Sequence, residues 1–310
     1  MKEIKIHGDS PRSGTVPSGI LFALLAALIS GISIFYNKLI IVRGIDPLIF
    51  NIIKNGGTAI ILSLFFLWRR QNIVNKISKD NLWKKLVLIG VIGGSIPFIL
   101  FFQGLTKVAA INANLIQKTL FIWVAILAIP ILREKIHPLA IIGYLLVIYA
   151  NFFIGGVSGF KFSIFEGMIL TATILWAIEN IIAKKTLKET DSSVVAWGRM
   201  TFGVLVLIMA AIVSGKSDLI FKLSPDQAMP ILGSIILLTL YVSSWYKALK
   251  LAPATTVTAI LVLATPITNI LSAIFITHNF APVFTFNTTA ITFGVLLISL
   301  ERQWRSKIAV

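Results

Sequence analysis

Long apolar runs alternate with short polar connections along most of the chain. Ten of these runs are long enough to cross about 30 Å of hydrocarbon as an α-helix. They span residues 17–42, 46–68, 84–105, 109–131, 137–156, 163–185, 192–214, 227–249, 253–277 and 281–300. The pattern therefore predicts an all-α membrane protein with ten transmembrane helices.

The composition agrees with a membrane protein and excludes a soluble one. Of the 310 residues, 57% are hydrophobic and only 13% are charged, and the mean hydropathy is +0.92. Such a chain is too apolar for a soluble globule and indicates an integral, multi-pass protein. The first run is too long for the apolar core of a signal peptide and lacks its cleavage pattern, so we expect it to remain as a helix.

The charges indicate how the chain is oriented in the membrane. Lys and Arg number 28 against 12 Asp and Glu, for a net charge of +16. In a soluble domain this excess would suggest nucleic acid, but here the basic residues lie almost entirely between the apolar runs and gather in alternate connections. Connections rich in Lys and Arg stay cytoplasmic. We therefore expect cytoplasmic tails at residues 1–16 and 301–310, and no nucleic-acid partner. We also expect the protein to lie in a prokaryotic cell membrane.

Residues for catalysis or metal binding are missing from the spans. The chain has no cysteine, and its three histidines, His7, His137 and His278, lie in expected connections or at helix ends. Nothing is left within the spans for a metal centre or a histidine triad. The chain also lacks the G-x-x-x-x-G-K-[ST] motif of nucleotide hydrolysis. We expect neither an enzyme nor a primary pump, and no cofactor or metal.

Two parts of the chain repeat one another coarsely. Residues 104–138 and 248–282, which are 144 positions apart, share a small-residue entry, a polar first half, an apolar second half and a final proline. At an offset of 145, Asp46–Lys54 matches Asp191–Arg199, with a cation eight residues after an acid in both. These matches favour a duplicated architecture.

The duplication divides the chain into five-helix halves at residues 17–156 and 163–300. Because five is an odd number, the second half must enter the membrane upside down relative to the first. Secondary transporters are built from such inverted repeats, and their substrate site lies near the membrane midplane between the halves. We therefore expect a central cavity at that position.

The repeated segments also carry the residues of a known family. In the first half, Gly104-Leu105 precedes Ala109-Ala110, and the segment ends in Arg133-Glu134-Lys135-Ile136; in the second, Ala248-Leu249 precedes Ala252-Pro253-Ala254. This arrangement resembles the EamA-type transporters of the drug/metabolite transporter superfamily. His278 stands where the acid would repeat and departs from the pattern. The resemblance implies a helical basket around a central cavity and an activity in metabolite transport.

Polar residues within the spans are the candidates for substrate binding. A lysine near the middle of a membrane helix costs roughly 3 kcal/mol or more unless it faces protein or water, so Lys54 and Lys118 should line a cavity. Amides and hydroxyls on the same helix faces would extend this wet surface. The candidate residues are Lys118, Asn114, Gln117, Lys54, Asn51, Asn55 and Thr258. The alternative is a structural role, in which these groups bond to neighbouring helices.

Glu179 and Arg199 leave two interpretations open. Both lie at similar depth in neighbouring expected helices, so they could form a buried ion pair. Alternatively, Glu179 could take up a proton during transport. Either way, Lys54, Lys118 and Arg199 outnumber the one acid well inside a span. The excess of positive charge favours a substrate with a carboxylate or phosphate.

Taken together, the sequence predicts a secondary transporter that moves a small organic metabolite by alternating access. An amino acid or organic anion is the expected substrate, and export is the expected direction. The alternatives are a sugar-phosphate or nucleotide-sugar exchanger, a channel, or a lipid-handling protein. The expected partners are the metabolite and the lipid bilayer, and the chain would act as a monomer or homodimer.

Overall fold

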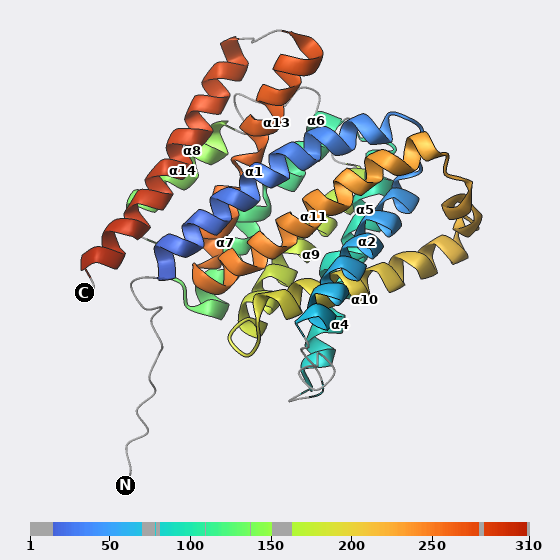
Figure 1. Cartoon of the computed structure of the whole chain (residues 1–310). Coiled ribbons are helices and arrows are strands. Elements are labelled where there is room, and N and C mark those ends of the chain that lie inside the picture. The colour runs from blue at the N-terminus through green and yellow to red at the C-terminus, as the bar shows by residue number, and fades with distance from the viewer. Residues whose placement is uncertain are drawn as a thin grey trace.

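A computed structural model describes residues 15–69, 78, 81–108, 110–136, 138–150, 163–278 and 282–308. Within these ranges the regular elements are all helical (Figure 1). The first half holds α1 (Thr15–Ile41), α2 (Pro47–Trp68), α4 (Leu82–Gly94), α5 (Ile96–Leu105), α6 (Ala110–Lys118), α7 (Leu120–Leu132) and α8 (Pro138–Tyr149). The second half holds α9 (Ile164–Thr186), α10 (Ser192–Val213), η3 (Ser217–Lys222), α11 (Pro225–Leu251), α12 (Ala254–Leu261), α13 (Ala264–Ser272), η4 (Ala273–Thr277) and α14 (Pro282–Ile308).

Eight segments of the described chain are long and apolar enough to cross a membrane. Two shorter apolar helices, Pro138–Tyr149 and Phe286–Leu300, lie where the fifth and tenth spans were expected. The multi-pass architecture is thus confirmed, and the count of ten spans stays a prediction. Helix α14 continues to Ile308, so it extends into the segment expected as a C-terminal tail. The tail expected at residues 1–16 lies almost wholly outside the described residues.

Three expected spans are interrupted instead of continuous. The third divides into α4 and α5 at Ser95, whose φ of −141° and ψ of −70° leave the helical region. The fourth divides into α6 and α7 at Thr119, and the ninth into α12 and α13 at Val262 and Leu263. The latter two breaks fall at corresponding places in the two halves. Hydropathy alone could not locate them, because each of the three spans is strongly apolar on average across its length.

The first helices of the two halves point in opposite directions. Arg43, just after α1, donates to the backbone oxygen of Asp226 near the start of α11, at 3.3 Å. Gly19, near the start of α1, packs against Ala252 just after α11. Lys184, near the end of α9, donates to the oxygen of Ala252 at 2.7 Å. The end of α9 therefore lies beside the start of α1, as an inverted repeat requires.

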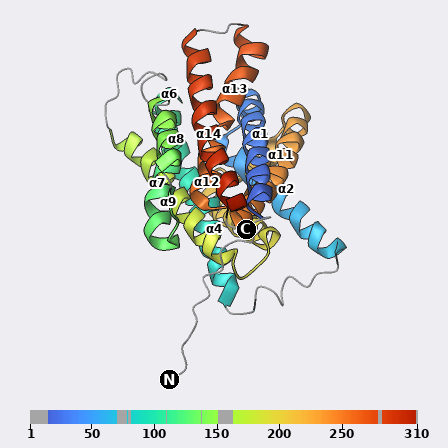
Figure 2. The same ribbon diagram turned by 90° about the vertical axis from the view of Figure 1, so that its left-hand side faces the viewer.

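The packing between helices follows the same two-fold relation. The contact of α1 with α11 corresponds to that of α9 with α4 and α5, and the contact of α2 with α11 to that of α10 with α4. Likewise α1 packs on α12 and α13 as α9 packs on α6 and α7. Three further pairs, α2 with α10, α7 with α12 and α8 with α14, correspond to themselves. Figures 1 and 2 show the resulting bundle, in which helices of the two halves lie side by side, such as α1 with α11 and α8 with α14.

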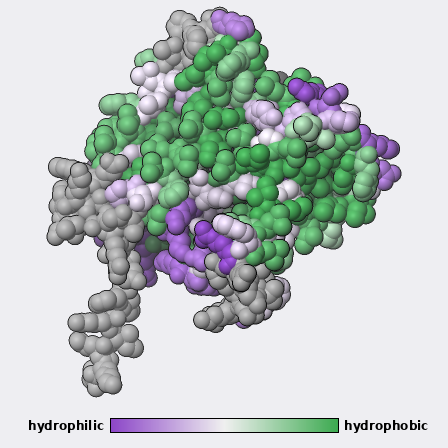
Figure 3. All heavy atoms as spheres, viewed as in Figure 1, coloured by the Kyte–Doolittle hydropathy of each residue, from purple (hydrophilic) through white to green (hydrophobic). Residues whose placement is uncertain are grey.

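The outer surface suits a lipid environment. Large apolar side chains face outward from most of the long helices, among them Leu21 at 66% exposure, Leu67 at 72% and Met209 at 64%. Figure 3 shows a broad apolar surface on one face of the molecule, with hydrophilic residues gathered toward its edges. In water such a surface would drive aggregation, whereas lipid tails solvate it.

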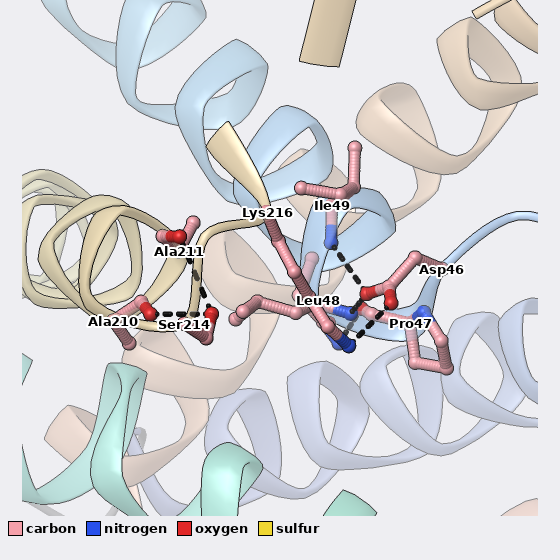
Figure 4. A network of polar contacts seen from close by, with 9 residues as sticks. Asp46, Pro47, Leu48, Ile49, Ala210, Ala211, Ser214 and Lys216 are labelled. Atoms are coloured by element: carbon pink, nitrogen blue, oxygen red, sulfur yellow. Dashed lines mark hydrogen bonds and ion pairs between the residues drawn. The ribbon is translucent and has the colours of Figure 1, made fainter. Parts of the chain in front are cut away.

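Asp46 fixes the start of α2. Its carboxylate accepts hydrogen bonds from the backbone N–H of Leu48 at 2.8 Å and of Ile49 at 3.4 Å, and Pro47 occupies the first turn. Lys216 of the second half pairs with the same carboxylate at 2.7 Å (Figure 4). Partial burial raises the pKa of Asp46, but the hydrogen bonds from Lys216 and the two amides outweigh it and hold the pKa below its usual value.

Candidate functional site

A cavity of about 290 Å³ lies between the two halves. Helices α1, α2, α5, α6 and α7 line it from the first half, and α9 to α13 from the second. Charged, amide and hydroxyl groups face the same space as aromatic rings. A largely apolar pocket with a few convergent polar groups is the usual form of a small-molecule site.

Two lysines of the first half line this cavity. Lys54 on α2 is 9% exposed, and its Nζ lies 4.8 Å from the centre of the Phe50 ring. Lys118 is the last residue of α6, beside the break at Thr119. Among the residues that the structure describes, neither ammonium group has a hydrogen-bond or ion-pair partner. Both charges are therefore free to meet an anion in the cavity.

Pro97 explains how Arg199 is placed in the opposite wall. In a helix, the N–H of residue 97 would bond to the carbonyl of Gly93, but proline has no N–H. The freed carbonyl of Gly93 instead accepts from Arg199 Nη2 at 3.0 Å and from Trp176 Nε1 at 3.1 Å. Both donors belong to the second half, on α10 and α9. A helix irregularity in one half thus positions a cation of the other.

Glu179 and Arg199 both pack against Gly93. A Cβ atom on Gly93 would be 2.8 Å from Glu179 Cδ and 3.1 Å from Arg199 Nε, so glycine is needed for both side chains to approach. Tyr246 donates its hydroxyl to Glu179 Oε1 at 2.6 Å. In the described part of the chain, the shortest contacts of the two charges are to these other groups, and no ion pair within 4.0 Å joins them. The ion pair, which was one of the two interpretations open from the sequence, is therefore not a direct contact in this structure, although the two side chains are neighbours.

Four buried polar atoms in the cavity wall have no partner in the described structure. They are Ser33 Oγ, Asn55 Nδ2, Asn180 Oδ1 and Arg199 Nε, the last three on side chains that are at most 9% exposed. Buried polar groups in folded proteins are nearly always hydrogen-bonded, because an unmade bond costs about 1–3 kcal/mol. Groups that a bound molecule or water would satisfy are typical of a binding site.

The other sequence candidates divide into three kinds. Gln117 and Thr258 line the cavity, and Thr258 Oγ1 donates to the carbonyl of Ala254 at 2.9 Å. Asn51 is 1% exposed, donates to the carbonyl of Pro47 at 2.8 Å, and is outside the set of described residues that line the cavity. The side chain of Asn114 lies outside the described residues, although its backbone belongs to α6.

One polar face of the cavity was missed by sequence reasoning. Ser30, Ser33 and Asn37 on α1 line the wall, and Asn37 Oδ1 accepts from Ser234 Oγ of α11 at 2.7 Å. The three residues of α1 follow one another at spacings of three and four, which places them on one helix face. This spacing was a usable signal, but the residues carry no charge and sit in a strongly apolar run.

Aromatic residues complete the wall. Trp176, Tyr241 and Trp245 line the cavity from α9 and α11, and the rings of Tyr241 and Trp245 stack at 6.0 Å. Trp176 also packs on Phe98 of α5 at 5.3 Å. These rings give the cavity apolar surface beside its charged groups, so a ligand with both a polar and an apolar part would fit.

The comparison with protein families decides the class of protein. The model described as the EamA-like transporter family matches residues 17–156 and again 164–300. The chain belongs to this family. It is therefore a membrane transporter of the drug/metabolite transporter superfamily, as the repeated segments of the sequence indicated. The two matches also confirm the division of the EamA chain into two repeats.

Two further comparisons concern individual proteins. No curated protein matches this EamA chain. A crystal structure described only as that of a protein aligns with a TM-score of 0.77 at 12% sequence identity, covering 92% of this chain and 97% of the other. At this identity the likeness shows a common fold and nothing about substrate.

Metal ligands are not gathered anywhere in the described residues. No group of three or more His, Cys, Asp or Glu side chains comes together there. The groups that line the cavity can bind a ligand by charge, hydrogen bonds and aromatic contact.

Proposed function

We propose that this EamA-family protein is a secondary transporter that carries a small organic metabolite with a carboxylate or phosphate group, by alternating access. The observation that carries the proposal is the unpaired positive charge in the cavity between the halves. Lys54 and Lys118 have no anionic partner among the described residues, and Arg199 keeps its Nε unbonded. An anionic substrate would supply the negatively charged hydrogen-bond acceptor that all three side chains lack.

The balance of charge supports an anion over a cation. Three cations and Glu179 face the cavity, and Glu179 already accepts a hydrogen bond from Tyr246. Such an excess of one sign within low-dielectric walls concentrates ligands of the opposite sign. A purely cationic substrate would have to approach Lys54 and Lys118 without a compensating anion.

The size of the cavity supports a compact substrate. Pockets for drug-sized ligands measure about 300–1,000 Å³. A volume of about 290 Å³ lies just below this range and suits an amino acid or a small organic acid. It favours these over a nucleotide sugar, which is the larger alternative.

The arrangement of the halves supports alternating access. The helices of the two repeats run in opposite directions, and the cavity lies between them. In such transporters the two repeats exchange conformations, which exposes one site first to one side of the membrane and then to the other. Export remains the expected direction.

The proposal is tested by ligand-induced thermal stabilisation of the purified protein. A library of carboxylates, phosphates, cations and neutral metabolites is compared on the wild type, on Lys118→Met and Lys54→Met, and on Lys247→Met. Lys247 is exposed on α11 and serves as the matched control. A ligand at 100 times its Kd stabilises a protein by about 2.7 kcal/mol, so binding raises the melting temperature measurably.

We expect anionic compounds to stabilise the wild type and Lys247→Met, and to lose most of their effect on the two cavity variants. Hits that are cationic or neutral would contradict the anionic substrate, and so would an unchanged response of both cavity variants. The mode of transport is tested with the best hit in proteoliposomes. Counterflow that saturates with substrate indicates a carrier, whereas flux that rises linearly indicates a channel.

A further inference from the structure

The junction between α11 and α12 is held by charges from elsewhere in the chain. The connection runs through Ala252 and Pro253, and proline at the N-cap of α12 has no side chain that could bond to the first N–H groups. Glu134, after α7 of the first half, takes this role. Its Oε1 accepts from the N–H of Ala254 at 2.7 Å, and its Oε2 from the N–H and hydroxyl of Thr255 at 3.0 and 2.7 Å.

Lys184 complements Glu134 at the end of α11. Its ammonium group donates to the carbonyl of Leu249 and, at 2.7 Å, to that of Ala252. A cation at a helix C-terminus and an anion at a helix N-terminus are each favoured by the helix dipole. Lys184 therefore caps the C-terminal end of α11, and Glu134 caps the N-terminal end of α12. The two charges also attract one another.

Lys184, and the start of α12 that Glu134 binds, each lie about one helical turn from the cavity. Asn180 lines the cavity on α9 four residues before Lys184, and Thr258 lines it on α12 four residues after Ala254. One turn of helix spans about 5.4 Å. A substrate that contacts these residues would therefore act directly on the helices that the two charges hold.

The opposite end of the molecule is built differently. Residue 278, which corresponds to Glu134 in the second repeat, is an exposed histidine in a left-handed conformation with φ of 51°. A carboxylate is thus present at one end of the molecule and replaced at the other. We call the end that carries Glu134, beside the start of α1, the terminal end.

We propose that Glu134 and Lys184 form a gate that closes the cavity at the terminal end, and that its release opens the cavity to that side. The proposal rests on the alternating access proposed above. Ala254 and Thr255 are at most 1% exposed, so their N–H groups need either Glu134 or water. Glu134 therefore bonds to these N–H groups when the terminal end is closed, and water takes its place when that end is open.

The test uses the absence of cysteine from the chain. Ser30→Cys places one thiol in the cavity wall, and a membrane-impermeant maleimide is added to sealed vesicles from the terminal or the opposite side. The reporter is combined with Glu134→Gln, with Lys184→Met, and with Lys185→Met. Lys185 is the exposed neighbour of Lys184 on the same helix and is the matched control.

We expect Glu134→Gln and Lys184→Met to raise the labelling rate from the terminal side at least about tenfold, because hydrogen bonds to a charged group shift an equilibrium by this factor. Labelling from the opposite side should fall, since alternating access opens one end as it closes the other. Lys185→Met should label like the parent. A protein that is merely loosened would label faster from both sides, and that result overturns the gate.

Thr255→Val covers the case in which Glu134→Gln fails to fold. This variant removes only the hydroxyl contact, and we expect a smaller rise in terminal-side labelling of about threefold, the effect of a hydrogen bond of modest strength. Unchanged labelling in both Thr255→Val and Lys184→Met overturns the proposal. Because the assay needs no substrate, a failure of anions to bind would contradict the proposed function and leave the gate standing.

Discussion

Two adjacent glycines of α2 allow the packing of the two halves to be tested within one turn of helix. At Gly57 an added Cβ would lie 2.9 Å from Ile235 Cγ1 and 3.0 Å from Cγ2, and closer still to Cδ1. At Gly56 the nearest atom would be Val204 Cγ2 at 3.6 Å, which is ordinary contact. Carbon atoms attract at about 3.5–4.0 Å and repel below that range. Alanine should therefore fit at residue 56 and clash at residue 57.

The magnitude follows from comparing the two variants. Replacing glycine with alanine inside a helix gains about 1 kcal/mol at either position, so this gain cancels in the comparison. Overpacking a tight interior costs about 1–3 kcal/mol and applies to Gly57→Ala alone. Gly57→Ala should thus be less stable than Gly56→Ala by about 1–3 kcal/mol. For a chain of this size, that corresponds to a difference of roughly 2–6 °C in melting temperature.

The assay is thermal unfolding of the purified protein, followed by tryptophan fluorescence. Both variants are heated at one scan rate, since unfolding of large proteins is often irreversible and the apparent midpoint depends on the rate. Ile235→Val, which removes the Cδ1 atom, costs about 0.5–1.5 kcal/mol in the wild type. In Gly57→Ala it should cost less or restore stability, because it makes room for the new methyl group. Equal midpoints for the two alanine variants, or strictly additive effects of Ile235→Val, would refute the described packing of α2 on α11.

Two further predictions concern charged groups. Because the pKa of Asp46 is lower in the folded chain than in the unfolded one, its stabilising effect is complete above the unfolded-state pKa and is lost as the pH falls through the folded-state value. Melting temperatures measured from neutral to acid pH should therefore converge for wild type and Asp46→Asn. Asparagine caps a helix as well as aspartate, so the variant loses only the ion pair with Lys216 and the interaction with the helix dipole, and wild type should be more stable at neutral pH by about 0.5–1 kcal/mol; parallel curves would contradict this. Glu179→Gln, which cannot exchange a proton, should abolish substrate accumulation driven by a pH gradient while counterflow persists. Loss of both activities would show that Glu179 has a structural role.

The sequence was sufficient for the membrane class and the two-repeat architecture because lipid imposes a simple rule. Every span must be long and apolar, and the charges between spans orient the chain, so membrane class and duplication could be read from the pattern. The same rule directed attention to Lys54, Lys118, Glu179 and Arg199, since a charge inside a span must face protein or water. The structure places all four around one cavity.

Uncharged residues were harder to place from the sequence. Asn51 shares the apparent polar face of α2 with Lys54, yet its amide bonds back to Pro47 one turn earlier. Ser30 and Asn37 line the cavity but have polar groups that any membrane helix tolerates. Whether such a group turns to its own backbone or to a neighbour depends on packing between helices, which a single sequence does not encode locally.

The role of Pro97 has a consequence for substrate preference among related chains. The Gly93 oxygen that it frees holds the guanidinium of Arg199 against the cavity wall. A residue with an N–H at position 97 would compete for this oxygen and leave Arg199 to turn toward the substrate or toward Glu179. The charge that a ligand meets could then change although every side chain around the cavity stays the same. Selectivity in this fold can thus diverge through the backbone, at a position that comparison of the cavity residues alone would overlook.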